Sequence, residues 1–424
     1  MIRRFFRFLL CGVLFLSACS KRERSAEDEA EWADIQPLTN VSVVADVPAE
    51  AKTNLSRRIV QSEGEDYAPL IQRLEEMEAL VRSEGETVVT GEHLTLGYNQ
   101  HFVRMNQDVV VLDDRGTLKA DWLEGRFSAS NEVESIEAKG HVRMDVQHPE
   151  GRVQLTGNHL VLDRDRRMIQ MDKDVVVVDA RGKLWADRLV AHFSVSNEVK
   201  KVEARGHVRM ESDGRTAVAE RADYNYQTGF VQLEGMARVA DGVNKMSGER
   251  IQFWTKGTRR MVCEPNAFLE ISDTKGVSME GLPAEKGKAV GNTEIRSDRL
   301  VYNEAKGFAE AVGNVRVRDP RVAMNCGIIR LFLKEGNEID WIEAESEVII
   351  QLDDRKALAD RARYYTDDGR FVLDGDPKLK MGQNIMTGDR MTFWQETRRM
   401  VCEPNARMLL YPDEETKAKF QKDL

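Results

Sequence analysis

The chain is dominated by an internal duplication of 54 residues. The stretch 91–144 recurs as 157–210, and 29 of the 54 positions are identical. A second copy relation joins residues 221–254 to residues 361–394. Repeats at a fixed spacing are typical of stacked supersecondary units, each of which buries its apolar face against the next. The sequence therefore predicts a stack of similar units, and the fold of one unit decides the fold of the chain.

After Glu86 the apolar residues alternate with polar ones at a period of two. Ile251 and Phe253 flank Gln252, and Val315 and Val317 flank Arg316. A period of two places alternate side chains on opposite faces of a strand. Turns rich in Gly, Asn and Asp separate these segments, so the pattern predicts strands of roughly five to eight residues and an all-β fold.

One helical segment precedes the predicted strands. Residues 65–84 have a period near 3.6, with Tyr67, Leu70, Leu74 and Val81 on one stripe and acidic residues elsewhere. Such a short amphipathic helix could cover the exposed end of a repeat stack, bind a partner or lie on a membrane surface. Its polar face is acidic rather than basic, which argues against the membrane surface.

The first 19 residues have the layout of a secretory signal. Three arginines precede the apolar run Phe8–Leu16, which is too short to span a bilayer. Residues 16–19, Leu-Ser-Ala-Cys, resemble the lipobox of bacterial lipoproteins, which implies that Cys19 is lipidated and becomes the first mature residue. Ser20 then favours the outer membrane under the sorting rule of enterobacterial lipoproteins. Residues 20–64 are rich in Glu, Asp, Ala and Ser, so we expect a flexible tether there.

Charge and cysteine content exclude several functions. Charged residues make up 32% of the chain and the formal net charge is −10, which argues against binding to nucleic acid. Cys11 and Cys19 lie in the signal, whereas Cys263 and Cys402 occupy equivalent repeat positions and Cys326 has no such counterpart. This spacing is not that of a disulfide scaffold. We expect Cys263 and Cys402 to be small inward side chains that do not pair with each other.

No catalytic or metal-binding motif stands out. His93 and His159 are repeat copies, as are His141 and His207, and there is no H-E-x-x-H, phosphate-loop or G-x-S-x-G motif. A repeat-built carbohydrate-active enzyme would need a carboxylate cluster that breaks the repeat symmetry, and the sequence has none. The sequence therefore predicts no catalytic residue, no metal and no cofactor.

The strand segments occur in a fixed order. A Y-x-Y strand is followed by an apolar strand ending near Gly, an A-x-V strand, G-[ED]-[RK]-I-x-[FY] and a closing [RK]-M. The pattern is clearest over ERADYNYQTGFVQLEGMARVADGVNKMSGERIQFWTKGTRRM at 220–261 and in its copy at 360–400. This array resembles the LptA/OstA family of lipopolysaccharide-transport proteins over residues 86–410. The resemblance implies stacked antiparallel β-jellyrolls, also called β-tacos, that form an elongated open sandwich.

The resemblance also implies an apolar trough between two sheets that holds the acyl chains of lipopolysaccharide or of its lipid A part. The strand period makes the following residues its inward candidates: Val175, Val177, Leu189, Ala191, Phe193, Val231, Leu233, Ile251, Phe253, Val315 and Val317. Their charged neighbours should then lie outside or at the rim, namely Asp187, Arg188, Glu249, Arg250, Arg316 and Arg318. The same inward side chains could instead pack on each other as a closed sandwich core.

These inferences divide the chain into a series of segments. They are a signal at 1–19, a tether at 20–64, a helix at 65–84, a first jellyroll at 86–222, a central half-module at 223–296, a second jellyroll at 297–412 and a polar tail at 413–424. The implied function is a non-enzymatic, lipid-anchored periplasmic bridge that carries lipopolysaccharide to the outer membrane and joins other transport proteins edge to edge. The alternative is a structural or assembly lipoprotein of the envelope that joins partners through exposed sheet edges.

Overall fold

The computed structural model describes residues 41–43 and 87–411. Gaps within the second range fall at 114–115, 130–132, 149–150, 181, 196–197, 213, 243, 255, 258–259, 272–291, 304, 320–321, 335–338, 353–354 and 395. The described residues are almost entirely antiparallel β-structure, with a single 3₁₀ turn, η2 (Tyr98–Gln100), which confirms the predicted all-β fold. The predicted signal, helix and polar tail lie outside the described residues, as does the tether apart from residues 41–43.

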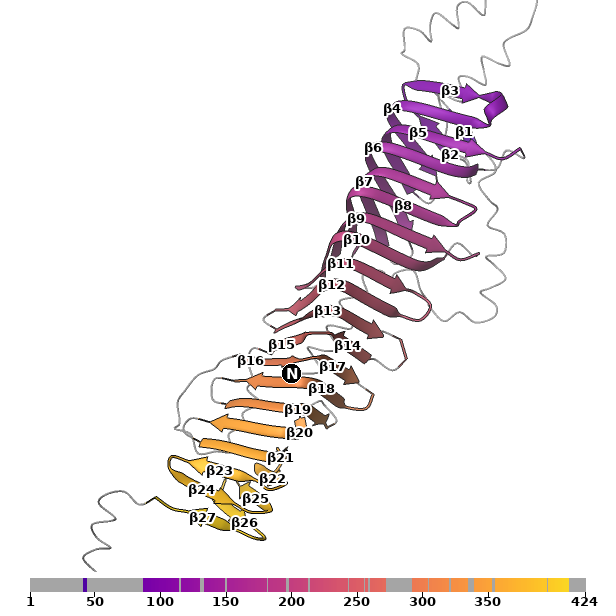
Figure 1. The fold of residues 1–424 in the computed structure, drawn as a ribbon. Helices are drawn as coiled ribbons and strands as arrows, with labels where there is room; N and C mark the ends of the chain where they lie inside the picture. The colour runs from indigo at the N-terminus through magenta and orange to yellow at the C-terminus, as the bar shows by residue number, and fades with distance from the viewer. Residues whose placement is uncertain are drawn as a thin grey trace, which may run out of the picture. The chain divides into compact units, whose positions relative to one another are not determined.

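The chain forms two compact units that divide between residues 208 and 209. The strands of the first unit are β1 (Val41–Val43), β2 (Thr87–Thr90), β3 (His93–Gly97), β4 (Phe102–Asp113), β5 (Gly116–Phe127), β6 (Val133–His148), β7 (Gly151–Asp163), β8 (Met168–Val178) and β9 (Gly182–Phe193). Strand β10 (Val199–Ser212) carries the chain into the second unit. From β4 to β9 each strand pairs antiparallel with the next, and β1 is the exception because it lies parallel to β2 (Figure 1).

The second unit repeats this meander with more interruptions. Its strands are β11 (Arg215–Asn225), β12 (Phe230–Asp241), β13 (Asn244–Trp254), β14 (Arg260–Glu264), β15 (Ala267–Ile271), β16 (Thr293–Ser297), β17 (Arg299–Asn303), β18 (Phe308–Arg318), β19 (Val322–Leu333), β20 (Ile339–Leu352), β21 (Arg355–Tyr365), β22 (Arg370–Asp374), β23 (Lys378–Met381), β24 (Asn384–Thr387), β25 (Arg390–Trp394), β26 (Arg399–Cys402) and β27 (Arg407–Leu409). The long strands have 11 to 16 residues, roughly twice the predicted length. They are longer because each passes through a bend and continues on the other side.

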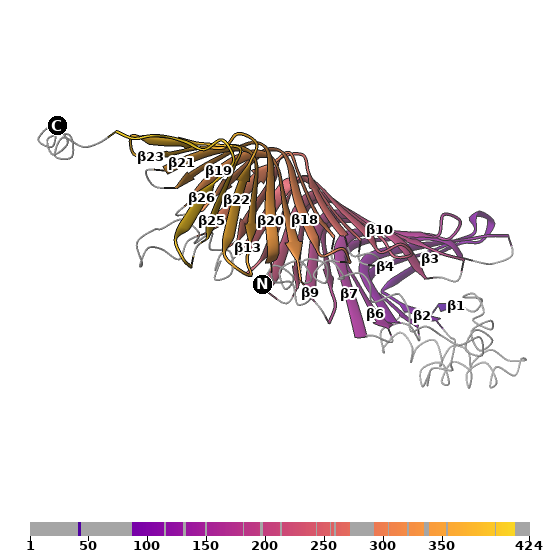
Figure 2. The same cartoon turned by 90° about the horizontal axis from the view of Figure 1, so that it is seen from below.

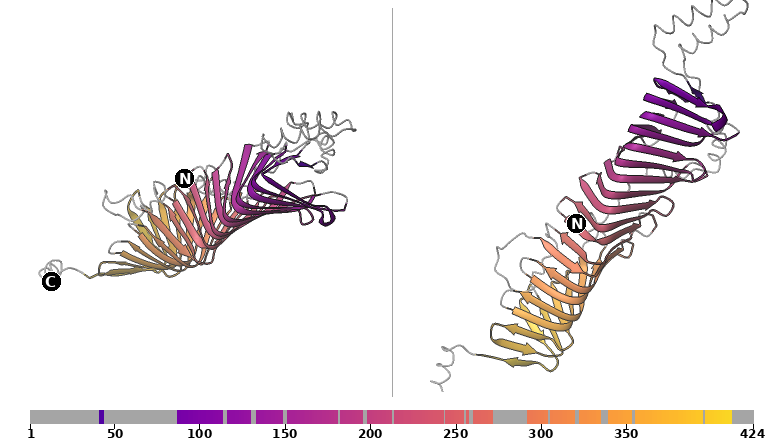
Figure 3. Two further views of the ribbon diagram at one scale, coloured as in Figure 1. Left: turned by 90° about the horizontal axis from the view of Figure 1, so that it is seen from above. Right: turned by 45° about the horizontal axis from the view of Figure 1, so that its top comes forward.

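Each long strand contributes one half to each of two sheets. In the second unit, one half of β13 pairs with β14 and the other half pairs with β15. We call the two sheets sheet A and sheet B. Besides the halves of the long strands, sheet A contains β14, β17, β22, β25 and β26, and sheet B contains β15, β16, β23, β24 and β27. In the first unit β3 begins sheet A and β2 begins sheet B, and β4 pairs with both. Figures 2 and 3 show the long strands of each unit bent near their middles.

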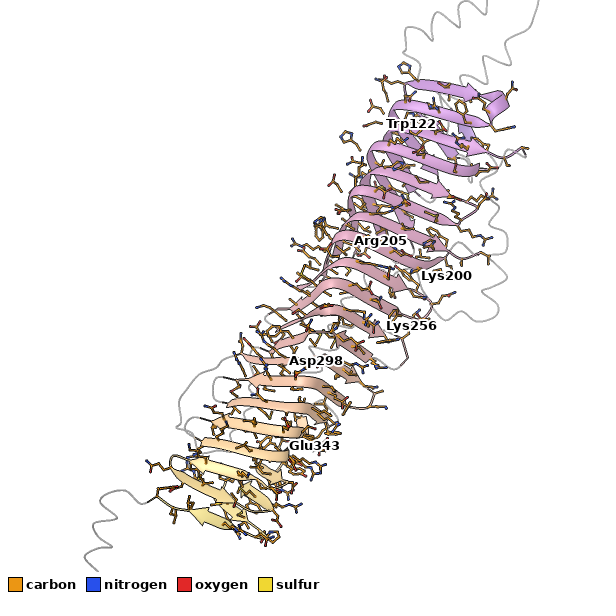
Figure 4. The ribbon with its side chains drawn as sticks, in the orientation of Figure 1. Trp122, Lys200, Arg205, Lys256, Asp298 and Glu343 are labelled. Atoms are coloured by element: carbon orange, nitrogen blue, oxygen red, sulfur yellow. The ribbon has the colours of Figure 1, made fainter. Side chains whose placement is uncertain are left out.

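A repeated pair of residues marks five of the bends. At one strand a carboxylate lies at the corner, and 16 to 20 residues later a residue in the left-handed backbone region hydrogen-bonds to it. Four such pairs lie 2.8 to 2.9 Å apart: His141 with Asp121, Asn266 with Glu249, Asn314 with Asp298 and Asn405 with Asp389. His207 and Asp187 form a fifth pair, at 2.9 Å. Asp298 is labelled in Figure 4. Asn readily adopts left-handed geometry and donates from a short side chain, so it suits this position.

The inner side of the bend accepts only small residues. Ala120, Ala186 and Ser297 precede corner carboxylates, and all three are buried. At the equivalent Gly248 an added Cβ would meet the Cys263 sulfur. The two sheets approach each other most closely here, and the space between them cannot hold a larger side chain.

The outward face of sheet A carries paired charges and stacked aromatic rings. Arg330 lies between Glu310 at 2.8 Å and Glu345 at 2.6 Å, and its hydrogen bond lowers the pKa of the Glu345 carboxyl. Glu343, labelled in Figure 4, accepts from Arg363 at 3.0 Å. Four neighbouring strands also place rings side by side, and the closest pair is nearly parallel with centroids 3.9 Å apart. The four rings are Phe308, Phe332, Trp341 and Tyr365. Such cross-strand pairs fix the register of the strands.

The bend can be tested with two glycines that share a backbone conformation. Gly206 (φ 74°) lies beneath the Asp187 carboxylate, whereas Gly214 (φ 78°) has no heavy atom near the position of an added Cβ. Both alanine variants carry the left-handed strain of roughly 1–2 kcal/mol. We expect Gly206→Ala to lower the free energy of unfolding by about 1–3 kcal/mol more than Gly214→Ala, because it also displaces the carboxylate. Urea unfolding of the two variants measures the difference, and equal losses would show that the corner carboxylate tolerates displacement.

Candidate functional site

The candidate site is the apolar interior between sheets A and B. In the first unit, the inward residues next to the bend form one row across sheet A, and all of them are buried: Met105, Leu123, Ala138, Leu160, Met171 and Leu189. In the same unit Val109 from sheet B packs in one cluster with Met105 and Leu123 from sheet A. The two halves of the bent strands therefore share one core.

The predicted inward residues occupy this interior to different depths. Nine of them are buried: Val175, Val177, Leu189, Val231, Leu233, Ile251, Phe253, Val315 and Val317. Ala191 and Phe193 are half-buried, since they lie further from the bend on β9. Their charged neighbours Asp187, Arg188, Glu249, Arg316 and Arg318 are exposed, and Arg250 is half-buried. The inward and outward registers of these strands follow the period of two.

In the first unit the row of inward residues one step further from the bend is mostly only half-buried. We call this the mouth row of sheet A, and it consists of Leu96, Val103, Gly125, Ile136, Leu162, Ile169 and Ala191, each opposite the next. Leu96 is 59% exposed, and every other member except Gly125 is half-buried. The facing positions Val111, Leu118 and Met144 on sheet B are half-buried as well. The first unit therefore has an apolar interior whose outer part stays accessible.

In the second unit aromatic side chains fill the same row. The corresponding positions begin with Tyr224, Val231, Phe253, Met261 and Tyr302, again each opposite the next. None of these five side chains is more than 4% exposed. Large rings reach across the interior where the first unit has aliphatic side chains, so this part of the second unit is closed. The next inward residues, from Leu331 to Phe393, include both buried and half-buried side chains.

The sequence prediction therefore missed most of the mouth row and included only Ala191 from it. Val103, Ile136, Leu162 and Ile169 lie in the mouth row, yet they were not among the predicted residues. A signal for them exists in the sequence, because equivalent inward positions are aliphatic before residue 200 and aromatic at Tyr224, Phe253 and Tyr302. A period of two identifies the inward face. Only the size of the residues that face each other across the interior decides whether that face is accessible.

The charges near the interior are engaged on the outward face. In the first unit Glu124 is buried and lies 2.6 Å from Arg104 and 2.9 Å from Arg126. Hydrogen bonds from Lys201 and Arg205 lower the pKa of the Glu203 carboxyl to about 2. These ions pair with each other on the outer face, and the side chains of the mouth row are apolar, so no charge of these pairs lies in the interior.

Further features bear on chemistry in the described part of the chain. No group of three or more His, Cys, Asp and Glu side chains there is arranged to hold a metal ion. The described residues also include no helix with the length and apolarity needed to cross a bilayer. Cys263, Cys326 and Cys402 are unpaired thiols, and burial raises the pKa of Cys263 to about 12 and that of Cys326 to about 11. These values suppress the reactive thiolate at neutral pH.

The two cysteines of the repeated nonapeptide make a matched test of burial. Cys263 is fully buried beneath β17, whereas Cys402 is half-buried on β26. We expect a thiol reagent at pH 8 to modify Cys402 at least tenfold faster than Cys263 in the folded protein, because the sequences around both residues are identical and only their burial differs. Mass spectrometry of timed samples gives both rates. Equal rates in the folded chain, with fast labelling of both in urea, would contradict the described burial.

Comparison with known proteins places the repeats in a described family. The family model "LptA/(LptD N-terminal domain) LPS transport protein" matches residues 88–192, 158–258 and 294–399, which together span more than half of the chain. The chain is 26% identical over 117 residues to "Uncharacterized protein RP507" of Rickettsia prowazekii (strain Madrid E), a match that covers 26% of this chain and 81% of that protein. A solved structure of LptH, the LptA homologous periplasmic component of the lipopolysaccharide transport device of Pseudomonas aeruginosa, matches at 14% identity and a TM-score of 0.26. That match covers 28% of this chain and 95% of LptH.

Proposed function

Because this chain belongs to the LptA/(LptD N-terminal domain) family of lipopolysaccharide transport proteins, we propose that it is a non-enzymatic periplasmic bridge that holds lipopolysaccharide by its acyl chains on the way to the outer membrane. The observation that carries the proposal is the mouth row of the first unit, an inward apolar surface that remains accessible. Apolar clefts with polar groups confined to their margins are the usual binding sites of apolar ligands.

The mouth row suits an acyl chain for two reasons. Backbone N–H and C=O groups are used by the strand ladders, so only the side chains of Val103, Ile136, Leu162 and Ile169 would contact the ligand. Their row crosses successive strands about 4.8 Å apart, so an extended alkyl chain could lie along several of them. Each buried CH₂ group would contribute about 0.8 kcal/mol, which makes even a partial chain a substantial ligand.

The second candidate is a structural or assembly lipoprotein of the envelope. The filled interior around Phe253 and Tyr302 favours this function for that part of the second unit, because those side chains already pack like a sandwich core. The accessible first unit favours the carrier. The two functions differ in whether lipid enters the mouth row.

Photo-crosslinking in cells separates the two functions. A photo-reactive residue at Ile169 or Leu162 should crosslink lipopolysaccharide, because both side chains face the accessible interior. The same residue at Arg188, exposed on the outward face of the neighbouring strand, should give less than about a tenth of that yield. Phe253, a predicted inward residue that is fully buried, should give a lower yield than Ile169 if the accessible mouth row is the binding surface. A folded protein at normal abundance that gives no lipid adduct at Ile136, Leu162 or Ile169 would favour the structural lipoprotein.

We also propose that Cys19 carries a lipid and attaches the mature chain to a membrane, with the outer membrane favoured by Ser20. Replacing Cys19 with Ser should move the protein from the membrane fraction to the soluble periplasmic fraction, because the thiol that accepts the lipid is lost. Fractionation with an immunoblot and labelling with palmitate measure the effect. The lipobox hypothesis fails if the Ser variant stays with the membranes and the natural protein takes up no label.

The partners that fit this role are other lipopolysaccharide-transport proteins that join edge to edge. Within the described residues the chain offers such edges at β3 and at β26 and β27, whereas β2 is paired on one side with β4 and on the other with β1. An edge strand presents unpaired backbone groups, which a strand from another protein can pair with.

A further inference from the structure

One copy of a repeated sequence is paired with further strands on its outer edge, and the other copy is not. The nonapeptide RRMVCEPNA occurs at 259–267 and at 398–406. The first copy passes through β14 into β15, and the next strands cover both, β17 on β14 and β16 on β15. The second copy passes through β26 towards β27, which pair with β25 and β24 respectively, and no other strand of the described residues pairs with either.

Burial records the difference between the two copies. Leu269 on β15 is 4% exposed, and its counterpart Met408 on β27 is 50% exposed. Leu409 and Leu410, which follow Met408, are also more than half exposed. Isolated apolar edges of this kind mark an interaction site. The covered copy shows what such an edge accepts, which is a pair of short strands with the geometry of β16 and β17.

The first strands of the chain have that geometry. TVVTGEHLTLG at 87–97 aligns with TEIRSDRLVYN at 293–303, so β2 corresponds to β16 and β3 to β17. Both pairs stand next to a long strand in the same way, β2 and β3 on β4, and β16 and β17 on β18. In the covered copy Leu269 lies opposite Ile295. The same register in a joint between two copies of the chain would place Met408 of one copy opposite Val89 of the other.

The edge of β2 that such a joint would use is already paired with another strand of the same chain. A strand has two edges, and β16 uses one for β18 and the other for β15. Strand β2 uses one edge for β4 and the other for β1, with Val41, Ser42 and Val43 parallel to Thr87, Val88 and Val89. We propose that β1 is an intramolecular competitor that holds the place of β27 from a second copy, so that joining of two copies requires β1 to leave. The inference rests on the edge joining in the proposed function but does not require bound lipid.

The balance between the two pairings follows from their geometry. Strand β1 offers three residues in parallel pairing, which is slightly less stable per residue than antiparallel pairing. In the joint, the three residues of β27 would pair antiparallel with β2 in place of β1, and the four residues of β26 would pair in addition with β3, as β14 pairs with β17 at four positions. The joint therefore gains more pairs than β1 loses. Only chains from which β1 has left can join. The apparent association constant of the joint is therefore its intrinsic value multiplied by the fraction of chains in which this edge of β2 is free.

The test uses the mature chain with Cys19→Ser, so that it is soluble, and measures association by sedimentation across a range of protein concentrations. Two variants of β1 are used, Ser42→Pro and the double variant Val41→Pro/Val43→Pro. Because proline has no backbone N–H, the two variants between them remove the hydrogen-bond donors on both edges of β1. Thr53→Pro, outside β1, is the control. We expect both β1 variants to associate at concentrations about tenfold lower than the control. In either background Met408→Asp should abolish association, because it places a charge opposite Val89.

A crosslinked form gives the opposite perturbation. Ser42→Cys/Val88→Cys, in a Cys402→Ser background, joins two residues that lie opposite each other, and the oxidised protein should remain monomeric until it is reduced. Three outcomes would overturn the proposal: β1 variants that associate no better than Thr53→Pro, association that survives Met408→Asp, or no association by any variant. Lipid crosslinking from Ile169 in the same variants reports on the carrier function separately, so its failure would leave this result interpretable.

Discussion

The hydrogen bond between a corner carboxylate and a left-handed residue on the following strand is the contact on which both units depend. Without it, a strand of 14 residues such as β10, which carries His207, would continue straight, and its apolar face would need a second layer to cover it. The bend lets a single meander supply both layers. A left-handed residue costs roughly 1–2 kcal/mol, and one exposed hydrogen bond contributes about 0.5–1.5 kcal/mol. The contact therefore adds little net stability and mainly sets the direction of the chain.

Much of this fold could be predicted from the sequence, because it depends on local periodicity. The alternation around Ile251 and Phe253 predicts that both side chains are buried, and the copy relation predicts that the units repeat. The length of the strands could not be predicted in the same way. Small residues followed by Asp, as at Ala186-Asp187, look like the start of a turn, and only the partner His207 shows that the chain bends there and continues.

The accessibility of the interior is a further property that periodicity cannot give. Ile169 and Phe253 both occupy inward positions one step from the inner row, yet one is half-buried and the other is fully buried. The difference arises from the volume that side chains on both sheets bring to the same space, and those residues are far apart in sequence. Burying a ring such as Phe253 stabilises a unit by about 1.5–3 kcal/mol. A unit whose inward residues stay half-buried gives up part of that contribution to its stability.

The repeated nonapeptide shows that the burial of a strand depends on the strand that follows it. Met261 and Met400 have the same neighbours in sequence, yet Met261 is fully buried and Met400 is only half-buried. A stack of repeats that no capping unit covers therefore leaves an edge that resembles its own interior. The last strands of the described residues are short, four residues in β26 and three in β27, and each begins with an arginine, Arg399 and Arg407. Short, charged edges pair poorly with arbitrary strands. A partner that offers two strands in the spacing of β16 and β17 would gain the pairing of both sheets at once, so the edge discriminates by geometry as well as by its exposed apolar side chains.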